Sequence, residues 1–420
     1  MGPRPLAPLF PEIGVIGMVP TRWDSSWSSR HFVLSRLSQY FQVVWMNPAH
    51  GVRDLLNKGK IVHRKQEFSP VPGLRVYTPE PWLPRVHGFS WVGSQTFRRR
   101  LQRARSLLTS RGATKVVLYL WRPEFAPALD ALQHELSCYH IDDEYSFSDV
   151  ELPIADPEER LIGAVDQVFI TSQAMLEKKG GINRRTSVVP NGVDYRSYAE
   201  SHPEPDDLAG IPHPRIGYTG RLKRVLNWPL LLELSARHPE WHFVLIGPKA
   251  PHPEIEAPLA ELEQRANVHI LPGKSVKDLA AYPQYFDACL MPYVENDYTK
   301  YIYPMKLHEF LASGTPVIGA PIPALREFQG FIELASTTDE WSAAIARCLD
   351  PMQNGADERA MRQSIARHHD WALLASRIAA TLAHRLGREV SDRFTAITGE
   401  RIDRREGERR HFERQTSELV

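Results

Sequence analysis

The stretch YPMKLHEFLASGTPV, residues 303–317, joins a short helical pattern directly to a buried strand and thereby indicates the fold class. Pro304 suits the first turn of a helix, where its missing N–H costs nothing, and Gly314 suits the cap at the carboxyl end. The β-branched and apolar residues that follow predict a strand. A helix that passes at once into a buried strand is the repeating unit of parallel α/β domains.

Two charged residues of this stretch, Lys306 and Glu309, stand one turn apart beside the apolar face of Leu307, Phe310 and Leu311. A solvated i, i+3 salt bridge is the simplest interpretation. The alternative is a ligand site, because the amino end of a helix attracts anions and a lysine there adds a charge for a phosphate. A glutamate one turn deeper can accept hydrogen bonds from a diol such as a ribose, so the pair also fits a nucleoside diphosphate.

Length and composition predict two α/β domains. The 420 residues are 42% apolar and 24% charged, an ordinary globular balance, and suffice for two cores of about 200 residues. A net charge of +1 supplies no global field for nucleic acid. Three single cysteines, no secretory signal and no apolar run of membrane-spanning length lead us to expect a cytoplasmic protein without disulfides or a thiolate metal site.

Short β-branched runs alternate with helical patterns along the chain, which predicts two Rossmann-like, doubly wound domains. The predicted strands are 13–19, 42–46, 74–78, 115–120, 137–141, 167–171, 186–189, 215–220, 241–246, 268–271, 288–291, 315–318 and 331–334. The expected organisation is an N-terminal domain, a proline-rich linker that acts as a hinge, a C-terminal domain, a helix that crosses back to the first domain and a charged, solvated tail, over 1–200, 201–214, 215–365, 366–386 and 387–420. Ligands of such domains bind in the cleft outside the carboxyl ends of the strands.

A second candidate segment is GYTGRLKRVLNW, residues 217–228, which follows the first strand of the C-terminal half. Gly220 permits a close approach of the backbone, and Arg221, Lys223 and Arg224 crowd the same turn. A solvated loop is one interpretation. The location at the carboxyl edge of the sheet favours the other, a diphosphate site shared with Lys306.

The order of several motifs makes the resemblance specific. VVPNGVD (188–194), GYTGRLKR (217–224), FVLIGP (243–248) and PMKLHEFLASGTPVIGAP (304–321) resemble the GT-B glycosyltransferases. The chain is similar in particular to family-4-like enzymes of bacterial cell-surface polysaccharide assembly, including the teichuronic acid type, over roughly residues 13–386. The resemblance implies a GT-B fold, two Rossmann-like domains that face a central cleft, with the acceptor on the first domain and the nucleotide sugar on the second.

The resemblance also implies roles for single residues. Glu309 matches the glutamate that holds the ribose hydroxyls, while Arg221 and Lys306 match contacts to the diphosphate. The turn that ends at Val276 would hold the base through backbone atoms. The family motif has a further glutamate that grips the sugar hydroxyls, and Tyr301 stands at that position here. The family's lysine shortly after the arginine is displaced, so that Lys223 or Arg224 takes its place.

Asp142 and Asp143 follow a predicted strand whose end should face the cleft, so either is a candidate catalytic base or acceptor-positioning group. The alternatives are an acidic loop that caps the next element and, less favoured, a metal site; we expect no bound metal. The segment FRRRLQRARSLL, residues 97–108, predicts a basic amphipathic helix. Its simplest interpretation is a surface helix packed on the first sheet, and the sharper one is peripheral contact with an anionic membrane.

These observations favour a metal-independent, retaining glycosyltransferase that moves a sugar from a UDP- or GDP-linked donor to a glycan or lipid-linked glycan acceptor. The donor is a substrate, so no cofactor is expected. One rival is a nucleotide-sugar 2-epimerase of GT-B fold, which needs no acceptor. The other is a non-catalytic nucleotide-sugar-binding scaffold, which the replacement of a family glutamate by Tyr301 would fit.

Overall fold

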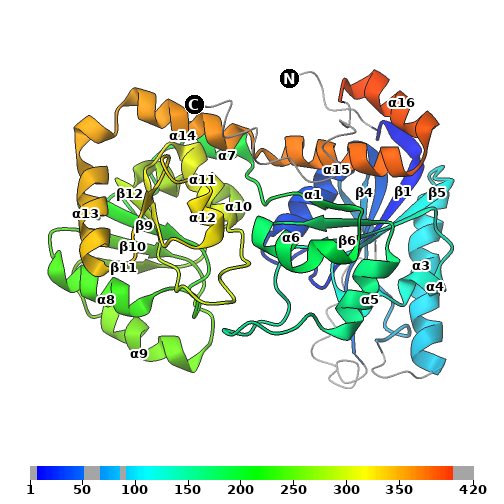
Figure 1. Ribbon diagram of the computed structural model, residues 1–420, viewed down its shortest axis with the longest axis horizontal. Helices are drawn as coiled ribbons and strands as arrows, with labels where there is room; N and C mark the ends of the chain where they lie inside the picture. Colours follow the sequence, from blue (N-terminus) through cyan, green and yellow to red (C-terminus); the bar gives the residue numbers. More distant parts are fainter. Residues whose placement is uncertain (1–6, 52–66, 86–90, 401–420) are drawn as a thin grey trace. The chain divides into compact units, whose positions relative to one another are not determined.

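The computed structural model describes residues 7–51, 67–85 and 91–400. Two compact units make up the chain (Figure 1). The first unit comprises residues 1–142, 153–189 and 372–420, and the second comprises residues 143–152 and 190–371. No helix among the described residues combines the length and the apolar character that a membrane crossing requires.

The first unit contains an eight-stranded sheet in the order β3-β4-β2-β1-β5-β6-β7-β8. Its strands are β1 (Phe10–Met18), β2 (Phe41–Met46), β3 (Glu67–Val71), β4 (Leu74–Tyr77), β5 (Lys115–Leu120), β6 (Leu136–Ile141), β7 (Gln167–Ile170) and β8 (Thr186–Val188). All neighbours are parallel except β3, which pairs antiparallel with β4. The central strands are near-continuous apolar runs because helices cover a parallel sheet on both faces.

The helices of the first unit are α1 (Ser29–Leu37), α3 (Trp91–Thr109), α4 (Ala128–Ala131), α5 (Asp156–Ala164), α6 (Gln173–Lys179), α15 (Trp371–Arg385) and α16 (Arg388–Thr398). The chain returns to this unit along α15, which begins at the unit boundary. It turns back at Gly387 into α16, as Figure 1 shows. The guanidinium of Arg385 donates a hydrogen bond of 3.0 Å to Gln167 at the start of β7, which ties α15 to the sheet.

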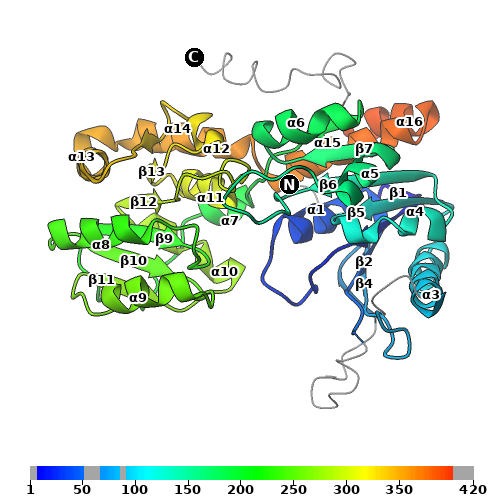
Figure 2. The ribbon, with the colours of Figure 1, turned by 60° about the horizontal axis from the view of Figure 1, so that its bottom comes forward.

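The second unit contains a six-stranded, wholly parallel sheet in the order β11-β10-β9-β12-β13-β14 (Figure 2). Its strands are β9 (Arg215–Thr219), β10 (His242–Ile246), β11 (Val268–Leu271), β12 (Ala288–Met291), β13 (Val317–Gly319) and β14 (Glu333–Leu334). Its helices are α7 (Tyr195–Ala199), α8 (Trp228–Arg237), α9 (Pro253–Leu262), α10 (Val276–Leu279), α11 (Met305–Ser313), α12 (Pro323–Arg326), α13 (Thr338–Leu349) and α14 (Ala356–Arg367). The order reverses between β9 and β12, so this sheet has its topological switch point there.

Two predicted connections differ from the structure. The stretch 201–214 is not a linker between the units but part of the second unit. Leu208 and Ile211 are buried in its core, and Arg215 pairs with Glu204. A hinge is therefore not expected in this stretch, because its apolar residues and ion pair fix it to the unit's own core.

The predicted solvated tail is also wrong over 388–398, which form α16. Val390 and Phe394, one turn apart, are buried, and the ring of Phe394 stacks on Phe10 with centroids 5.6 Å apart. The apolar pair is hidden in the sequence by the charges around it. The remainder of the predicted tail, 401–420, lies outside the described residues.

Several buried histidines are held neutral inside the two cores. Burial lowers the pKa of His31 to about 4 and that of His140 to about 3, and it lowers the pKa of His308 well below the usual range. The ring of His140 lies flat against Trp121 and shares a 2.8 Å hydrogen bond with the hydroxyl of Tyr119. A proton on such a ring would be a buried charge, and at His140 the cost of burial exceeds the favourable effect of the Asp142 carboxylate.

We therefore predict that the protein loses stability between pH 6.5 and pH 5. The unfolded chain takes up protons with a pKa near 6.5, whereas the folded chain does not, so each histidine lowers the free energy of unfolding by about 2 kcal/mol over this window. Chemical denaturation at a series of pH values measures the slope. His140→Gln should reduce it, His368→Gln at an exposed position should not, and a flat profile in the parent protein would contradict the assignment.

Candidate functional site

The switch point of the second sheet brings three chain segments to one edge. Strand β9 ends at Thr219, and β12 ends at Met291, its neighbour across the switch point. The loops that follow leave the sheet at its carboxyl edge, and the second of them leads into α11. As predicted, α11 is capped by Pro304 and by Gly314, which takes the left-handed φ of 78°. The amino end of this helix therefore belongs to the edge where open α/β sheets bind their ligands.

Lys306, in the first turn of α11, lies against the backbone of Gly220. A Cβ atom on Gly220 would overlap the Cε and Nζ atoms of Lys306, and the φ of 135° at Gly220 is one that side chains disfavour. The next loop approaches just as closely, because a Cβ atom on Gly247 would overlap the carbonyl oxygen of Gly220. Glycine is required here for contact between helix and loop as well as for backbone geometry.

Three cations gather around this contact, and the ammonium of one of them, Lys306, lies 5.8 Å from the centre of the Tyr218 ring. Lys223 is near enough to Lys306 and Arg221 for both to lower its pKa, although burial is the larger cause. Burial likewise lowers the pKa of Lys306, and the nearby Glu309 counteracts it. Among the hydrogen bonds and ion pairs of the described residues, none involves the side chains of Arg221, Lys223 or Lys306. A partly buried cation without a partner is costly, so this cluster is suited to an anionic ligand.

Glu309 lies one turn deeper on α11. It makes no direct ion pair with Lys306 in the described part of the chain, which contradicts the interpretation of the two charges as a simple salt bridge. Burial raises the pKa of Glu309, while Lys306 and the Tyr198 hydroxyl lower it. The carboxylate is therefore available to a ligand, because it is not held in an ion pair within the helix.

The buried polar atoms of the second unit that lack hydrogen-bond partners among the described residues include the Thr219 Oγ1 and the Asn191 Oδ1. Thr219 precedes Gly220, and the Nδ2 of Asn191 donates a 2.6 Å hydrogen bond to the Tyr303 carbonyl just before α11. The Tyr198 hydroxyl is near Glu309. Buried polar groups are normally paired, so unpaired oxygens near this helix end suit a polar ligand. The sequence indicates only a tight turn at Asn191, and it contains no pattern that indicates a site residue at Tyr198.

The turn predicted to hold the base lies along the same edge. Gly273 approaches Pro248, which follows Gly247, so that a Cβ atom on Gly273 would lie 2.9 Å from the Pro248 ring. Val276 begins the short helix α10, whose first turn is capped by the Ser275 hydroxyl. The turn is therefore linked to Gly220 through one intervening loop, and the role of Val276 stays a prediction.

The remaining predicted residues are separated. Arg224 does not join the cation cluster; it pairs with Asp149. Asp142 belongs to the first unit, where the hydroxyl of Ser29 and the guanidinium of Arg30 hold its carboxylate at 3.0 and 2.9 Å. These contacts hold Asp142 at the amino end of α1, and its predicted catalytic or acceptor-positioning role stays a prediction.

Asp143 belongs to the second unit. It accepts hydrogen bonds of 3.3 Å from the Tyr298 hydroxyl, and its charge raises the pKa of Lys223. Asp143 is therefore the predicted aspartate that belongs to the same unit as the cation cluster.

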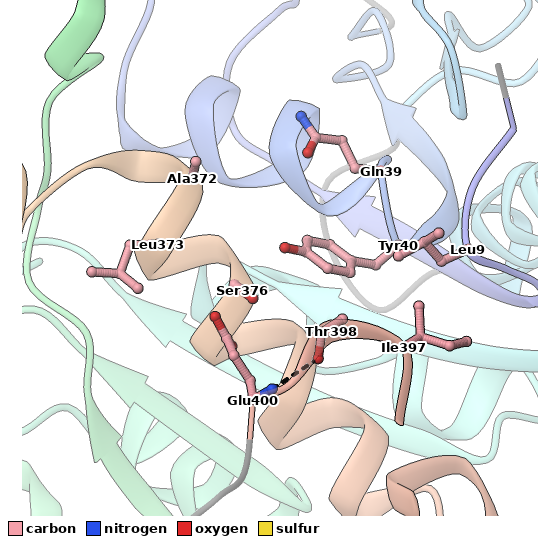
Figure 3. A pocket seen from close by; sticks show the side chains of 9 residues that line it. All are labelled: Leu9, Gln39, Tyr40, Ala372, Leu373, Ser376, Ile397, Thr398 and Glu400. Carbon is pink, nitrogen blue, oxygen red and sulfur yellow. Dashed lines mark hydrogen bonds between the residues drawn. The ribbon is translucent and has the colours of Figure 1, made fainter. Parts of the chain in front are cut away.

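A surface hollow of about 410 Å³ lies elsewhere, in the first unit (Figure 3). It is lined by Leu9, Gln39, Tyr40, Ala372, Leu373, Ser376, Ile397, Thr398 and Glu400. None of the predicted site residues contributes to it. We therefore assign the candidate site to the loops after β9 and β12 and the amino end of α11.

Part of the chain is similar in sequence to known proteins. Residues 213–351 match the family of glycosyl transferases group 1. The chain is 29% identical over 234 residues to TuaH of Bacillus subtilis (strain 168), a protein whose name describes a teichuronic acid biosynthesis glycosyltransferase. This match covers 54% of the chain and 58% of the relative, so it spans little more than half of that protein's length.

Solved structures share the whole architecture. Sucrose-phosphate synthase of Thermosynechococcus elongatus superimposes with a TM-score of 0.65 at 16% identity, over 89% of this chain and 98% of that one. HepE of Anabaena in complex with UDP-glucose gives a TM-score of 0.61 at 18% identity, over 89% and 99%. The fold is therefore GT-B, as predicted. The match to the group 1 family lies within the second unit, which also contains the candidate site.

We predict that Gly220→Ala lowers the free energy of unfolding of the second unit by about 1–3 kcal/mol, because it forces an unfavourable φ and displaces Lys306. Gly210→Ala is the matched control, since a Cβ atom there meets nothing within 4 Å. Chemical denaturation of both variants gives the comparison. Equal stability of the two would show that Lys306 does not rest on the Gly220 backbone.

Proposed function

We propose that the protein is a glycosyltransferase that moves a sugar from a nucleoside diphosphate donor to a glycan or lipid-linked glycan acceptor in cell-surface polysaccharide synthesis. The observation that carries this proposal is the cluster of Arg221, Lys223 and Lys306 around Gly220, whose side chains form no direct ion pair or hydrogen bond among the described residues. A diphosphate supplies negative charge that balances these three positive side chains. The name of the Bacillus subtilis relative supports the polysaccharide assignment.

The nucleotide has a complementary place in the site. Glu309 lies one turn beyond Lys306 and can accept hydrogen bonds from the ribose hydroxyls, while the turn before Val276 offers backbone groups to the base. HepE, which shares the fold, is solved with UDP-glucose. We therefore take a UDP-linked sugar as the first donor to test.

The chemistry follows from where charge develops. As the bond from the anomeric carbon to the phosphate breaks, negative charge builds on the leaving diphosphate. We expect Arg221, Lys306 and the N–H groups at the amino end of α11 to stabilise that charge, each by about 2–4 kcal/mol. This arrangement suits a retaining, metal-independent transfer in which the leaving phosphate accepts the proton of the acceptor hydroxyl.

We predict that Glu309→Ala weakens UDP binding by about 1.5–3 kcal/mol, because it removes charged hydrogen bonds to the ribose. Titration calorimetry with UDP measures the loss. Glu256→Ala, at an exposed position of α9, should bind UDP like the parent protein. Transfer of sugar from UDP-glucose should fall with Glu309→Ala. An unchanged UDP affinity in this variant would remove Glu309 from the site.

Helix α3 supports peripheral contact with a membrane as part of this function. Residues 81–123 contain no Asp or Glu but nine Lys or Arg. The helix packs inward through residues that include Leu101, Ala104 and Leu108, and Arg98 and Arg99 face solvent. Trp91 at its start is 76% exposed. Exposed arginines beside an exposed tryptophan suit anionic headgroups, where a lipid-linked acceptor would be met.

We predict that the protein binds phosphatidylglycerol vesicles at low salt, binds them more weakly at high salt, and does not bind phosphatidylcholine vesicles. Changing both Arg98 and Arg99 to Glu should reduce binding at least about tenfold, since each basic residue near the surface contributes about 1 kcal/mol. The control changes the exposed pair Arg184 and Arg185 to Glu. Vesicle sedimentation measures the binding. An equal loss of vesicle binding in both double variants would exclude α3 as the membrane contact.

A further inference from the structure

The 143–152 segment is a part of the second unit that the first half of the sequence supplies. It follows β6 directly, yet within the second unit it contacts Arg224, in the turn after β9, and the 294–301 loop, which comes after β12. This loop is also next to the cation-bearing turn, because Val294 donates a backbone hydrogen bond of 2.9 Å to Val225. The 143–152 segment is therefore attached to the edge of the sheet where the candidate site lies.

Side chains hold the 143–152 segment in place at several points. Asp149 pairs with Arg224 and accepts a 3.0 Å hydrogen bond from the Asn296 amide. Glu151 accepts a 2.5 Å hydrogen bond from the Tyr301 hydroxyl and pairs with Lys300 at 3.2 Å. Tyr301 thus occupies the family's glutamate position and uses its hydroxyl to bind a carboxylate from elsewhere in the chain. Its own side chain is buried and carries no charge for a sugar.

The backbone of the segment carries strain at the same place. Among the described residues other than glycine, Phe147 alone has a positive φ, which is 49°. Its ring centroid lies 6.2 Å from that of Tyr298, and its carbonyl accepts a 3.4 Å hydrogen bond from Arg224. Such a conformation costs about 1–3 kcal/mol and persists where surrounding contacts fix it, commonly at functional sites.

These contacts direct one carboxylate toward the cation cluster. Asp143 accepts hydrogen bonds of 3.3 Å from the Tyr298 hydroxyl to both of its oxygens, and it is close enough to Lys223 to raise that lysine's pKa. A carboxylate beside a diphosphate site would be repelled by the phosphates. It is compatible with the neutral group joined to them, the sugar, whose hydroxyls donate hydrogen bonds.

We propose that Asp143 supplies the sugar-binding carboxylate that the chain lacks at Tyr301, and that Tyr298 and the Glu151–Tyr301 contact position it. This inference rests on the proposed function, since it requires a nucleotide sugar on the cations. Asp143 then determines which donor sugar is accepted, while Tyr298 acts through Asp143. The 294–301 loop then does not contact the sugar itself. It holds the 143–152 segment, whose Asp143 contacts the sugar.

Calorimetric titration with UDP, UDP-glucose and UDP-galactose tests the proposal. We expect the parent protein to bind one sugar nucleotide more tightly than UDP. Asp143→Asn should reduce that extra affinity at least about tenfold and leave UDP affinity within about twofold. Asp206→Asn, at an exposed position of the second unit, is the control. Sugar-nucleotide affinity that is unchanged in Asp143→Asn, or never exceeds that of UDP in the parent protein, would overturn the proposal.

A double-mutant cycle separates positioning from general destabilisation. Tyr298→Phe removes one hydroxyl and should weaken binding of the same sugar nucleotide, but the effect should vanish in the Asp143→Asn background. Equal effects in both backgrounds would overturn the positioning role. Loss of kcat in Asp143→Asn with unchanged sugar discrimination would identify a base instead and also overturn it. Absence of UDP binding in the parent protein would refute the proposed function itself, a different result from all of these.

Discussion

The close contact between Lys306 and the Gly220 backbone is the constraint on which the second unit's site depends. It requires glycine at the end of β9, a helix that begins at Met305 and a loop short enough to bring the two together. The contact fixes an ammonium beside the carboxyl edge of the sheet and crowds it with Arg221 and Lys223. Because like charges repel and the side chains of Lys223 and Lys306 are only partly exposed, the folded protein holds a charge arrangement that an anion would complete.

The sequence predicted this arrangement because its signals are local. Pro304 and Gly314 mark the ends of α11, and strands such as β5 and β12 lie at their predicted residues, because buried parallel strands are near-continuous apolar runs. Helix phase then places Lys306 and Glu309 on one side, and the strand order places Gly220 opposite. Each of these predictions uses either residues that are close together in the sequence or a rule of sheet topology.

The features that sequence reasoning missed depend on distant contacts. Strand β3 has little apolar character and pairs at the sheet edge through a hairpin that propensity does not mark. Helix α16 rests on Phe394, whose partner Phe10 lies at the other end of the chain. Likewise, the different positions of Asp142 and Asp143, adjacent in sequence, follow from Arg30 on one side and Tyr298 on the other. No local pattern distinguishes the two aspartates.

The account's central claim is that Arg221, Lys306 and Glu309 bind one nucleoside diphosphate. A crystal structure of the protein with UDP tests it most directly. The account predicts phosphate oxygens within hydrogen-bond distance of Arg221 and Lys306, and the ribose hydroxyls on the Glu309 carboxylate. A well-ordered UDP bound elsewhere, with these three side chains unchanged and without ligand, would contradict it.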